Sequence, residues 1–298
     1  MSSKALRRKH GVHGILYESR NPQEEKIVNR QIVVFLAAAL ISLATGNSPA
    51  QVSSSPENSA ITIEYIAHAC FRVTSPSGEQ LLIDPFASRV WIGYDYPDGI
   101  ESDAVLITHP HYDHDGGISR DRKPPWPDKM TVWREPGRYE LGDVEILGVA
   151  GKHADPYGKE FGQTNTIWLL EVAGLRIAHI GDNGPVSEAA AAEIGTVDIL
   201  MMPIDSEYHI LKEHEIQAIL NQLDPDILIP MHYRLADLEP DADGPDDLGG
   251  VDGWLTSRKN VRRLMTHQAT ISSSELPDSR EILVFEHWPT LERPQSDK

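Results

Sequence analysis

A ten-residue segment, THPHYDHDGG at positions 108–117, concentrates side chains that bind metal ions. Its imidazoles and carboxylates belong to His109, His111, Asp113, His114 and Asp115. A solvated polar loop is the plain alternative, but such loops draw mainly on Ser, Asn, Lys and Glu and rarely concentrate imidazoles. Imidazole nitrogens and carboxylate oxygens suit Zn²⁺ and neighbouring divalent metals. The segment therefore indicates a metal site.

Further candidate ligands follow short apolar runs elsewhere in the chain. Five such runs end in a ligand-type residue, and these residues are Asp84, His109, His153, Asp182 and His232. In open α/β architectures the carboxyl ends of strands gather at one edge, so side chains far apart in sequence can converge there. His153 or His232 alone would more often be an ordinary hydrogen-bonded histidine. Their shared placement is what favours a functional site.

The elements that must position these residues are mainly short strands. Apolar runs bounded by turn signals predict strands at 61–66, 81–83, 104–107, 144–149, 166–172, 175–180 and 227–229. Ala173-Gly174 predicts a hairpin turn. Ser187 predicts the N-cap of a helix at 188–194, and residues 212–223 place Ile216, Ile219, Leu220 and Leu223 on one helix face. The mixture predicts an α/β fold.

The motif pattern resembles a known family. His109-x-His111-x-Asp113-His114, followed by Gly116-Gly117, resembles the signature of the metallo-β-lactamase superfamily of metal-dependent hydrolases. Its other motifs are matched in order by Ile83-Asp84-Pro85-Phe86, His153, Gly181-Asp182 and Pro230-Met231-His232-Tyr233. With Ala67-His68-Ala69, these motifs most resemble the branch of ascorbate-6-phosphate lactonases and N-acyl phosphatidylethanolamine phospholipases. The resemblance covers residues 61 to 233 and extends less clearly to Glu286.

The resemblance implies a four-layered αβ/βα sandwich with the site along one edge, and two divalent metal ions. These ions would be Zn²⁺, with Mn²⁺ or Fe²⁺ as alternatives. One metal would be held by His109, His111 and His153, and the second by Asp113, His114 and His232, with Asp182 as the bridge. Asp113 and Asp182 would also serve catalysis, Asp113 by orienting a metal-bridging hydroxide. Asp84 would support a ligating histidine without binding metal itself.

Several positions leave alternatives open. His68 could support a ligand, contact substrate or pack in the core. Tyr208, His209 and Tyr233 are candidates for substrate contacts or for protonating a leaving group. His179 could offer another ligand, since the strand pattern does not decide its direction.

Two departures from the family pattern narrow the activity. His111 stands where oxygen-reducing di-iron relatives have Glu, and Asp182 stands where a major branch of antibiotic-hydrolysing enzymes has Cys. The leading hypothesis is a hydrolase acting on a small ester, lactone or phosphoester. The alternatives are a phosphodiesterase or phospholipase, which requires an apolar or basic groove, and a non-catalytic metal-binding protein that keeps the fold.

Composition limits the partners. With 27 basic and 45 acidic residues among 298, the formal net charge is −18, which disfavours nucleic acid and anionic lipid. The expected partner is therefore a small molecule. Cys70 is the single cysteine, so an internal disulfide framework is excluded. The acidic segment 236–252 lacks the spacing of a twelve-residue calcium loop and is interpreted as a solvated loop.

The N-terminal region resembles a targeting segment. Ile32–Ala44 is a run of apolar or small residues preceded by Lys26 and Arg30 and followed by Ser48-Pro49-Ala50. This pattern is typical of a secretory signal, and the run is short for a membrane-spanning helix, which needs about 20 residues. We expect a targeting segment at 1–50, a linker at 51–60 and a hydrolase domain at 61–298. Export to the periplasm or the extracellular space follows, with a retained membrane anchor as the alternative.

Overall fold

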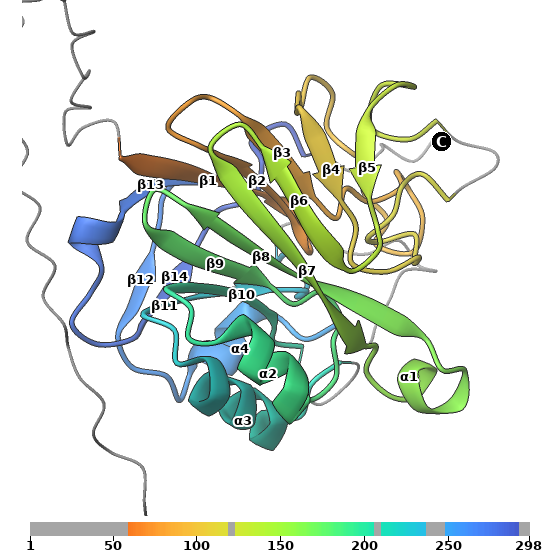
Figure 1. The fold of residues 1–298 in the computed structure, drawn as a ribbon. Helices are drawn as coiled ribbons and strands as arrows, with labels where there is room; N and C mark the ends of the chain where they lie inside the picture. The colour runs from red at the N-terminus through yellow and green to blue at the C-terminus, as the bar shows by residue number, and fades with distance from the viewer. Residues whose placement is uncertain (1–58, 119–122, 206–209, 237–247, 292–298) are drawn as a thin grey trace, which may run out of the picture. The chain divides into compact units, whose positions relative to one another are not determined.

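The strands of the domain form two sheets that pack face to face (Figure 1). This computed structural model describes residues 59–118, 123–205, 210–236 and 248–291. The first sheet has six strands in the order β13-β1-β2-β3-β4-β5. These strands are β1 (Ala60–Ala67), β2 (Cys70–Thr74), β3 (Gln80–Ile83), β4 (Ala104–Leu106), β5 (Thr131–Trp133) and β13 (Gln268–Ser272).

The second sheet has eight strands in the order β12-β14-β11-β10-β9-β8-β7-β6. Its strands are β6 (Gly137–Leu141), β7 (Val144–Lys152), β8 (Thr164–Val172), β9 (Leu175–His179), β10 (Ile199–Pro203), β11 (Ile227–Met231), β12 (Val261–Arg263) and β14 (Glu281–Val284). Strands β9, β10 and β11 are parallel, as are β3 and β4 in the first sheet. Their carboxyl ends therefore lie together at an edge of each sheet.

Alternation along the strands explains the packing between the sheets. Ile61, Ile63 and Tyr65 alternate with Thr62 and Glu64 along β1, and the apolar set is buried. These side chains share one core with Phe71 of the first sheet and with Trp168, Ile177 and Met201 of the second. Burial of such side chains contributes about 1.5–3 kcal/mol each. This core fixes the two sheets against each other.

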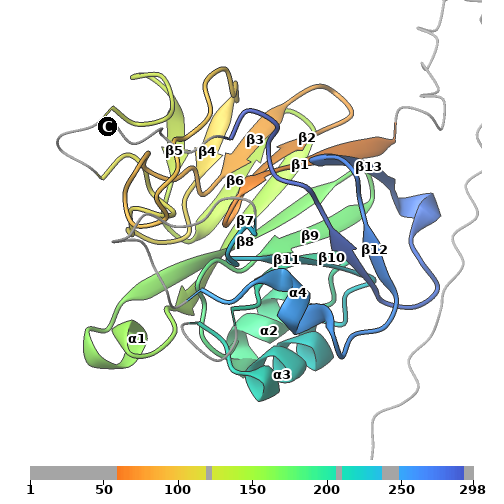
Figure 2. The same cartoon turned by 180° about the vertical axis from the view of Figure 1, so that it is seen from behind.

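Helices cover the outer face of the eight-stranded sheet. They are α2 (Glu188–Ile194), α3 (Glu213–Leu223) and α4 (Val251–Leu255), which lie on the same side of that sheet in opposite views (Figures 1 and 2). A short helix, α1 (Tyr157–Glu160), follows β7, and a 3₁₀ turn, η2 (Ser273–Glu275), follows β13. The Ser187 side chain caps α2, and the predicted apolar face of α3 is buried. Strand β8 is buried along nearly its whole length because it has layers on both faces.

The predicted α/β class and its two facing sheets are confirmed. The second helical layer of the predicted four-layered αβ/βα sandwich is not found in the described residues: their helices cover the eight-stranded sheet, and none lies over the outer face of the six-stranded sheet. That face carries polar side chains, including an Arg72–Glu64 ion pair with Nε and Oε2 2.6 Å apart. A sheet face of this kind tolerates solvent without a helical cover.

The N-terminal features predicted from the sequence, the targeting segment and most of the linker, lie outside the described residues. So does most of the acidic segment 236–252. Within the described ranges, no helix is long and apolar enough to cross a membrane.

Candidate metal centre

The residues predicted to bind metal converge between the ends of the two sheets. Each lies just after a strand or in the loop that follows it: His109, His111, Asp113 and His114 after β4, His153 after β7, Asp182 after β9, and His232 after β11. All seven except His111 are buried. The first and last of these residues are more than 120 positions apart in the sequence, and the order of the strands in the sheets brings them together.

The convergent side chains fall into two groups of four. One group is His109, His111, His153 and Asp182, and the other is His68, Asp113, His114 and His232. Within each group one ligand atom of every residue lies within 4.8 Å of the others. Six of the seven predicted ligands are divided between the groups as expected. The additional member of the second group is His68.

Asp182 faces both groups. Its Oδ2 atom lies 3.7 Å from Nε2 of His109 and 3.7 Å from Nε2 of His153. The same carboxylate reaches the second group, with Oδ1 3.2 Å from Nε2 of His114 and Oδ2 3.3 Å from Nε2 of His232. A carboxylate in this position can share its two oxygens between two cations.

His68 contacts the second group through Asp113. Its Nε2 lies 3.0 Å from Oδ2 of Asp113, and its ring lies 4.0 Å from that of His232 between centroids. The backbone carbonyl of His68 accepts a hydrogen bond from the amide of His232 at 2.9 Å. Of the three alternatives open from the sequence, these contacts favour support of a ligand.

Two buried carboxylates contact histidines of the second group at Nδ1, the ring nitrogen on the far side from the metal position. Asp84 Oδ2 lies 2.7 Å from His114 Nδ1, and Asp84 also accepts hydrogen bonds from the backbone and hydroxyl of Thr108. Asp205 Oδ2 lies 3.0 Å from His232 Nδ1. Such partners fix the tautomer, so that the other ring nitrogen faces the metal position. This role was predicted from the sequence for Asp84 but not for Asp205, which follows the apolar strand β10 in the same way.

The first group is oriented by neutral partners. His153 Nδ1 contacts the carbonyl oxygen of Ala154 at 2.9 Å, and His109 Nδ1 lies 3.0 Å from the Thr108 hydroxyl. The Gln163 side-chain amide lies 2.9 Å from Nε2 of His111, which leaves Nδ1 as the ring nitrogen that remains for a cation. Gln163 follows α1, and nothing in the local sequence indicates that it belongs to the site.

The backbone is strained at the strand ends that present the site. His68, Asp84 and His232 have positive φ angles of 58°, 48° and 58°. L-residues in this region cost about 1–3 kcal/mol each and persist where surrounding structure holds them. In each case the conformation follows directly on a strand and turns the side chain into the centre. The strained residues therefore lie at the candidate metal centre.

Gly181 and His179 shape the turn that carries Asp182. Gly181 has φ +53°, and an added Cβ would lie 2.5 Å from the Cβ of Thr108. His179 Nδ1 accepts the Gly181 amide at 3.2 Å, while Nε2 donates to the carbonyl of Ala69 at 2.9 Å. Because both of its ring nitrogens are used, His179 supports the turn and is not a ligand.

Unsatisfied polar atoms test whether these residues fit metal ions. The Nε2 atoms of His109, His114 and His153 and Oδ1 of Asp182 are buried and make no hydrogen bond to any described residue. Burial of a polar atom without a hydrogen bond costs about 1–3 kcal/mol, so a cluster of such atoms requires an explanation. All four belong to predicted ligands and face the same space. The donor set of imidazole and carboxylate fits divalent cations such as Zn²⁺.

The histidines of the centre differ in the direction of their pKa shifts. Burial lowers the pKa of His109 well below its ordinary value, and burial also lowers the pKa of His153 and His111. For His114 and His232, burial acts in the same direction, but the Asp182 carboxylate and its acidic neighbours raise their pKa well above the ordinary value. Burial would raise the pKa of Asp182, yet His114 and His232 hold it well below its usual range. Without metal, protons on His114 and His232 therefore balance the carboxylates.

The remaining candidates from the sequence lie elsewhere. Tyr233 is buried with its ring 6.1 Å from that of Tyr65, and burial raises its pKa to about 12. It packs in the core and lines none of the space around the ligands. Tyr208 and His209 lie outside the described residues. Cys70 is buried in the strand core, as expected.

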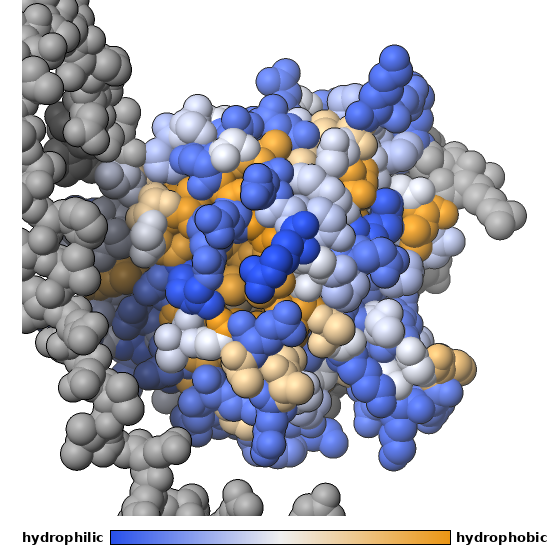
Figure 3. Space-filling view, viewed as in Figure 1, coloured by the Kyte–Doolittle hydropathy of each residue, from blue (hydrophilic) through white to orange (hydrophobic). Residues whose placement is uncertain are grey.

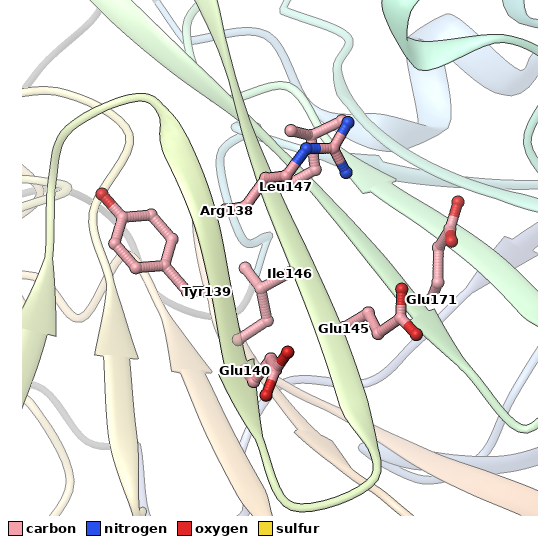
Figure 4. A pocket seen from close by; sticks show the side chains of 7 residues that line it. All are labelled: Arg138, Tyr139, Glu140, Glu145, Ile146, Leu147 and Glu171. Carbon is pink, nitrogen blue, oxygen red and sulfur yellow. The ribbon is translucent and has the colours of Figure 1, made fainter.

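A cavity away from these ligands has a different lining. Figure 3 shows apolar surface crossed by hydrophilic side chains on the face seen in Figure 1. A cavity of about 340 Å³ lies against β6, β7 and β8 (Figure 4), lined by Arg138, Tyr139, Glu140, Glu145, Ile146, Leu147 and Glu171. It contains no imidazole and none of the strand-end residues. The metal centre is therefore identified by ligand convergence and not by cavity size.

Comparisons with known proteins agree with this geometry. Residues 62–232 match the family model described as the beta-lactamase superfamily domain. A metal-dependent hydrolase of Thermococcus onnurineus is 24% identical over 193 residues, which cover 58% of this chain and 85% of the relative. A metal-dependent hydrolase of Carboxydothermus hydrogenoformans is 29% identical over 192 residues, covering 58% and 84%.

A solved structure shares the fold. It is that of a Thermotoga maritima protein named as a Zn-dependent hydrolase of the metallo-β-lactamase superfamily. Its TM-score is 0.57 at 24% identity, and the match covers 76% of this chain and 100% of the other. The family model ends at His232, the last of the predicted ligands. The matched region therefore contains both ligand groups.

Proposed function

Because the chain belongs to the β-lactamase superfamily, whose domain spans residues 62–232, we propose that it is a metal-dependent hydrolase with two divalent cations, preferably Zn²⁺. The first cation is assigned to His109, His111 and His153, the second to Asp113, His114 and His232, and Asp182 to both. The observation that carries this proposal is the position of the Asp182 carboxylate, within 3.7 Å of histidines from both groups.

The proposed reaction is hydrolysis of a small ester, lactone or phosphoester. When bound, two divalent cations supply a Lewis acid for the carbonyl or phosphoryl oxygen and make water acidic enough to attack near neutral pH. The chain's own contribution is orientation. Asp113 has one oxygen contacted by His68 and lines a cavity that opens from the centre, so it is placed to orient the attacking water.

Support comes from residues that fix the ligands before a substrate arrives. Asp84 and Asp205 hold the Nδ1 atoms of His114 and His232 at 2.7 and 3.0 Å, so each ring presents Nε2 to the centre. A preorganised site of this kind loses little free energy to reorganisation during the reaction. The complete ligand set also disfavours the non-catalytic metal-binding alternative.

The experiment is metal analysis combined with a substrate panel. Protein reconstituted with Zn²⁺ is offered lactones, carboxylic esters, phosphomonoesters, phosphodiesters and a chromogenic β-lactam. We expect turnover of at least one ester, lactone or phosphoester, abolished by chelation and restored by Zn²⁺. If the protein holds two ions and cleaves none of these classes, the proposed function is wrong.

We also propose export of the chain. The support is the sequence of Lys26, Arg30, the apolar run Ile32–Ala44 and the small residues that follow it. Cleavage near Ala50-Gln51 is the expected processing step. N-terminal sequencing of the natively produced protein tests it, and a cytoplasmic chain that begins before Ile32 would contradict it.

A further inference from the structure

A cavity of about 270 Å³ opens directly onto both ligand groups. It is lined by Trp91, Pro110, His111, Tyr112, Asp113 and Tyr157. His111 belongs to the first ligand group and Asp113 to the second. A substrate with its scissile bond at the metal centre can therefore place a substituent in this space.

Aromatic rings form walls beside the two groups. The Trp91 ring lies 5.7 Å from that of His68 and 6.1 Å from that of His232. The Tyr157 ring lies 5.1 Å from that of His111 and 5.3 Å from that of His153. A flat apolar group that enters from solvent would contact rings on the side of each group.

One exposed aromatic side chain lines this cavity, and a second lies next to a residue that does. Tyr112 is 46% exposed and lines it, and Phe161, 71% exposed, has its ring 6.0 Å from that of Tyr157. Among the described residues, only one other large hydrophobic side chain, Met265, is exposed to this degree. Exposed apolar side chains grouped beside a site indicate binding, since they add little to the core.

Charge separates the substrate classes. Among the described residues, Asp113 is the only carboxylate that lines the cavity, and no Lys or Arg lines it. A second anionic group on the substrate would find no cationic side chain among these residues. An uncharged group would lose little by leaving water for aromatic walls.

We propose that this cavity binds an uncharged aromatic or alkyl group next to the scissile bond, so that the substrates are neutral carboxylic esters or lactones carrying such a group. This inference rests on the proposed function and narrows it. Hydrolysis adds water across the acyl C–O bond: the carbonyl carbon gains the hydroxyl oxygen, the alkoxide leaves and takes a proton, and a carboxylic acid and an alcohol result. No other reactant is needed.

The cavity is large enough for an aromatic ring. An apolar cavity of about 150 Å³ accepts benzene. A volume of about 270 Å³ therefore has room for a benzyl group. Phospholipid substrates are disfavoured because no Lys or Arg lines the cavity among the described residues.

The test uses four small substrates with non-aromatic leaving groups on Zn²⁺-loaded protein, assayed by acid release at constant pH for the three carboxylic esters and by release of inorganic phosphate for the phosphoester. They are methyl acetate, methyl phenylacetate, methyl 4-carboxyphenylacetate and glycerol phosphate. We expect kcat/KM for methyl phenylacetate to exceed that for methyl acetate by about tenfold or more, the size of effect that an apolar pocket gives. The carboxylated ester, which has the same ring and one added charge, should fall at least tenfold below its neutral counterpart.

Variants locate the preference in the cavity. Tyr112→Ala should reduce the ratio of phenylacetate to acetate turnover at least fivefold, and Tyr112→Phe should retain the ratio because the ring remains. Metal content is measured for each variant, since Tyr112 lies between two predicted ligands. Tyr157→Ala, in a different segment, is the second variant. Met265→Ala, which removes an exposed apolar side chain outside the cavity, should change neither rate.

Binding gives a readout that does not depend on turnover. Phenylacetamide is a neutral analogue with an amide in place of the ester, and calorimetric titration should show at least fivefold weaker binding to Tyr112→Ala than to the parent. Equal or faster hydrolysis of the carboxylated ester or of glycerol phosphate would overturn the inference and leave the proposed function intact. Absence of turnover for all four substrates, and for the wider panel, in protein with two bound ions would overturn both.

Discussion

Asp205 Oδ2 lies 3.0 Å from Nδ1 of His232, and both side chains are fully buried. Asp205 follows β10, and His232 follows the parallel neighbour β11, so the register of two adjacent strands creates the pair. The contact orients His232 from behind while its Nε2 faces Asp182 at 3.3 Å. Asp205, which contacts no predicted metal position, therefore sets the orientation of His232, which is a predicted ligand.

Asp205→Asn should weaken metal binding at the second group without unfolding the domain. The amide keeps the shape of the carboxylate and removes the charge that fixes the imidazole tautomer. Changes of this kind typically cost about 10- to 100-fold in metal affinity or activity. Competition with a chromogenic chelator measures the affinity. Asp278→Asn, an exposed carboxylate, is the matched control, and an equal affinity in both variants would refute the role given to Asp205.

Gly181→Ala should destabilise the turn that presents Asp182. The added Cβ would lie 2.5 Å from Thr108 Cβ, on a backbone with φ +53°. Overpacking and left-handed strain together should cost about 2 kcal/mol or more in the free energy of unfolding, as measured by urea denaturation. Gly99→Ala is the control, because Gly99 has φ +79° and no atom within 4 Å of the added Cβ, so it reports the strain alone. Similar losses in both variants would mean that Thr108 does not constrain the turn.

The pH dependence of stability should change sign when metal is removed. In the metal-free protein the pKa of His114 and of His232 is raised above 6.5 in the folded state, since Asp182 and its acidic neighbours outweigh burial. Their contribution to stability is complete below pH 6.5 and is lost as the pH rises through the folded pKa. The histidines whose pKa is lowered, including His109 and His153, act in the opposite direction near pH 6.5, because their unfolded forms are still partly protonated there. Above about pH 7.5 they are neutral in both states and add no slope.

Thermal unfolding from about pH 7.5 to 9 measures this effect, since only His114 and His232 of the buried histidines still titrate there. Chelated protein should lose Tm as the pH rises, whereas Zn²⁺-loaded protein should gain Tm, because metal binding displaces protons from His114 and His232. In the chelated Asp182→Asn variant the loss of Tm should be smaller, because the charge of Asp182 no longer raises the pKa of His114 and His232. A chelated parent whose Tm rises over this interval would contradict the protonation states assigned here.

Residues whose position follows from a strand end could be predicted from the sequence. The strand-end rule placed Asp84, His153 and His232 at one edge, and the structure brings them there. The same rule applied to the run before Asp205 would have found it as well. Strands with continuous apolar runs, such as β3 and β8, were also predicted, and so was the Ala173-Gly174 turn, where both residues have positive φ.

Features that depend on tertiary contacts left no local signal. Strands β5, β6 and β12 are short or carry exposed charged residues, so their sequences lack a clear apolar period. Gln163 reaches His111 only because α1 folds beside the β4 loop, and Trp91 reaches the histidines from a segment that forms neither helix nor strand. The cavity between them is a property of the assembled fold.

The bridging role of Asp182 is the central claim, and metal stoichiometry tests it most directly. Parent protein and Asp182→Asn are reconstituted with Zn²⁺, dialysed, and assayed for ions per chain by mass spectrometry of the native protein. We expect two ions in the parent and no more than one tightly held ion in Asp182→Asn, because the carboxylate that offsets the repulsion between two cations has lost its charge. A parent that binds no metal, or an Asp182→Asn variant that retains two tightly held ions, would contradict it.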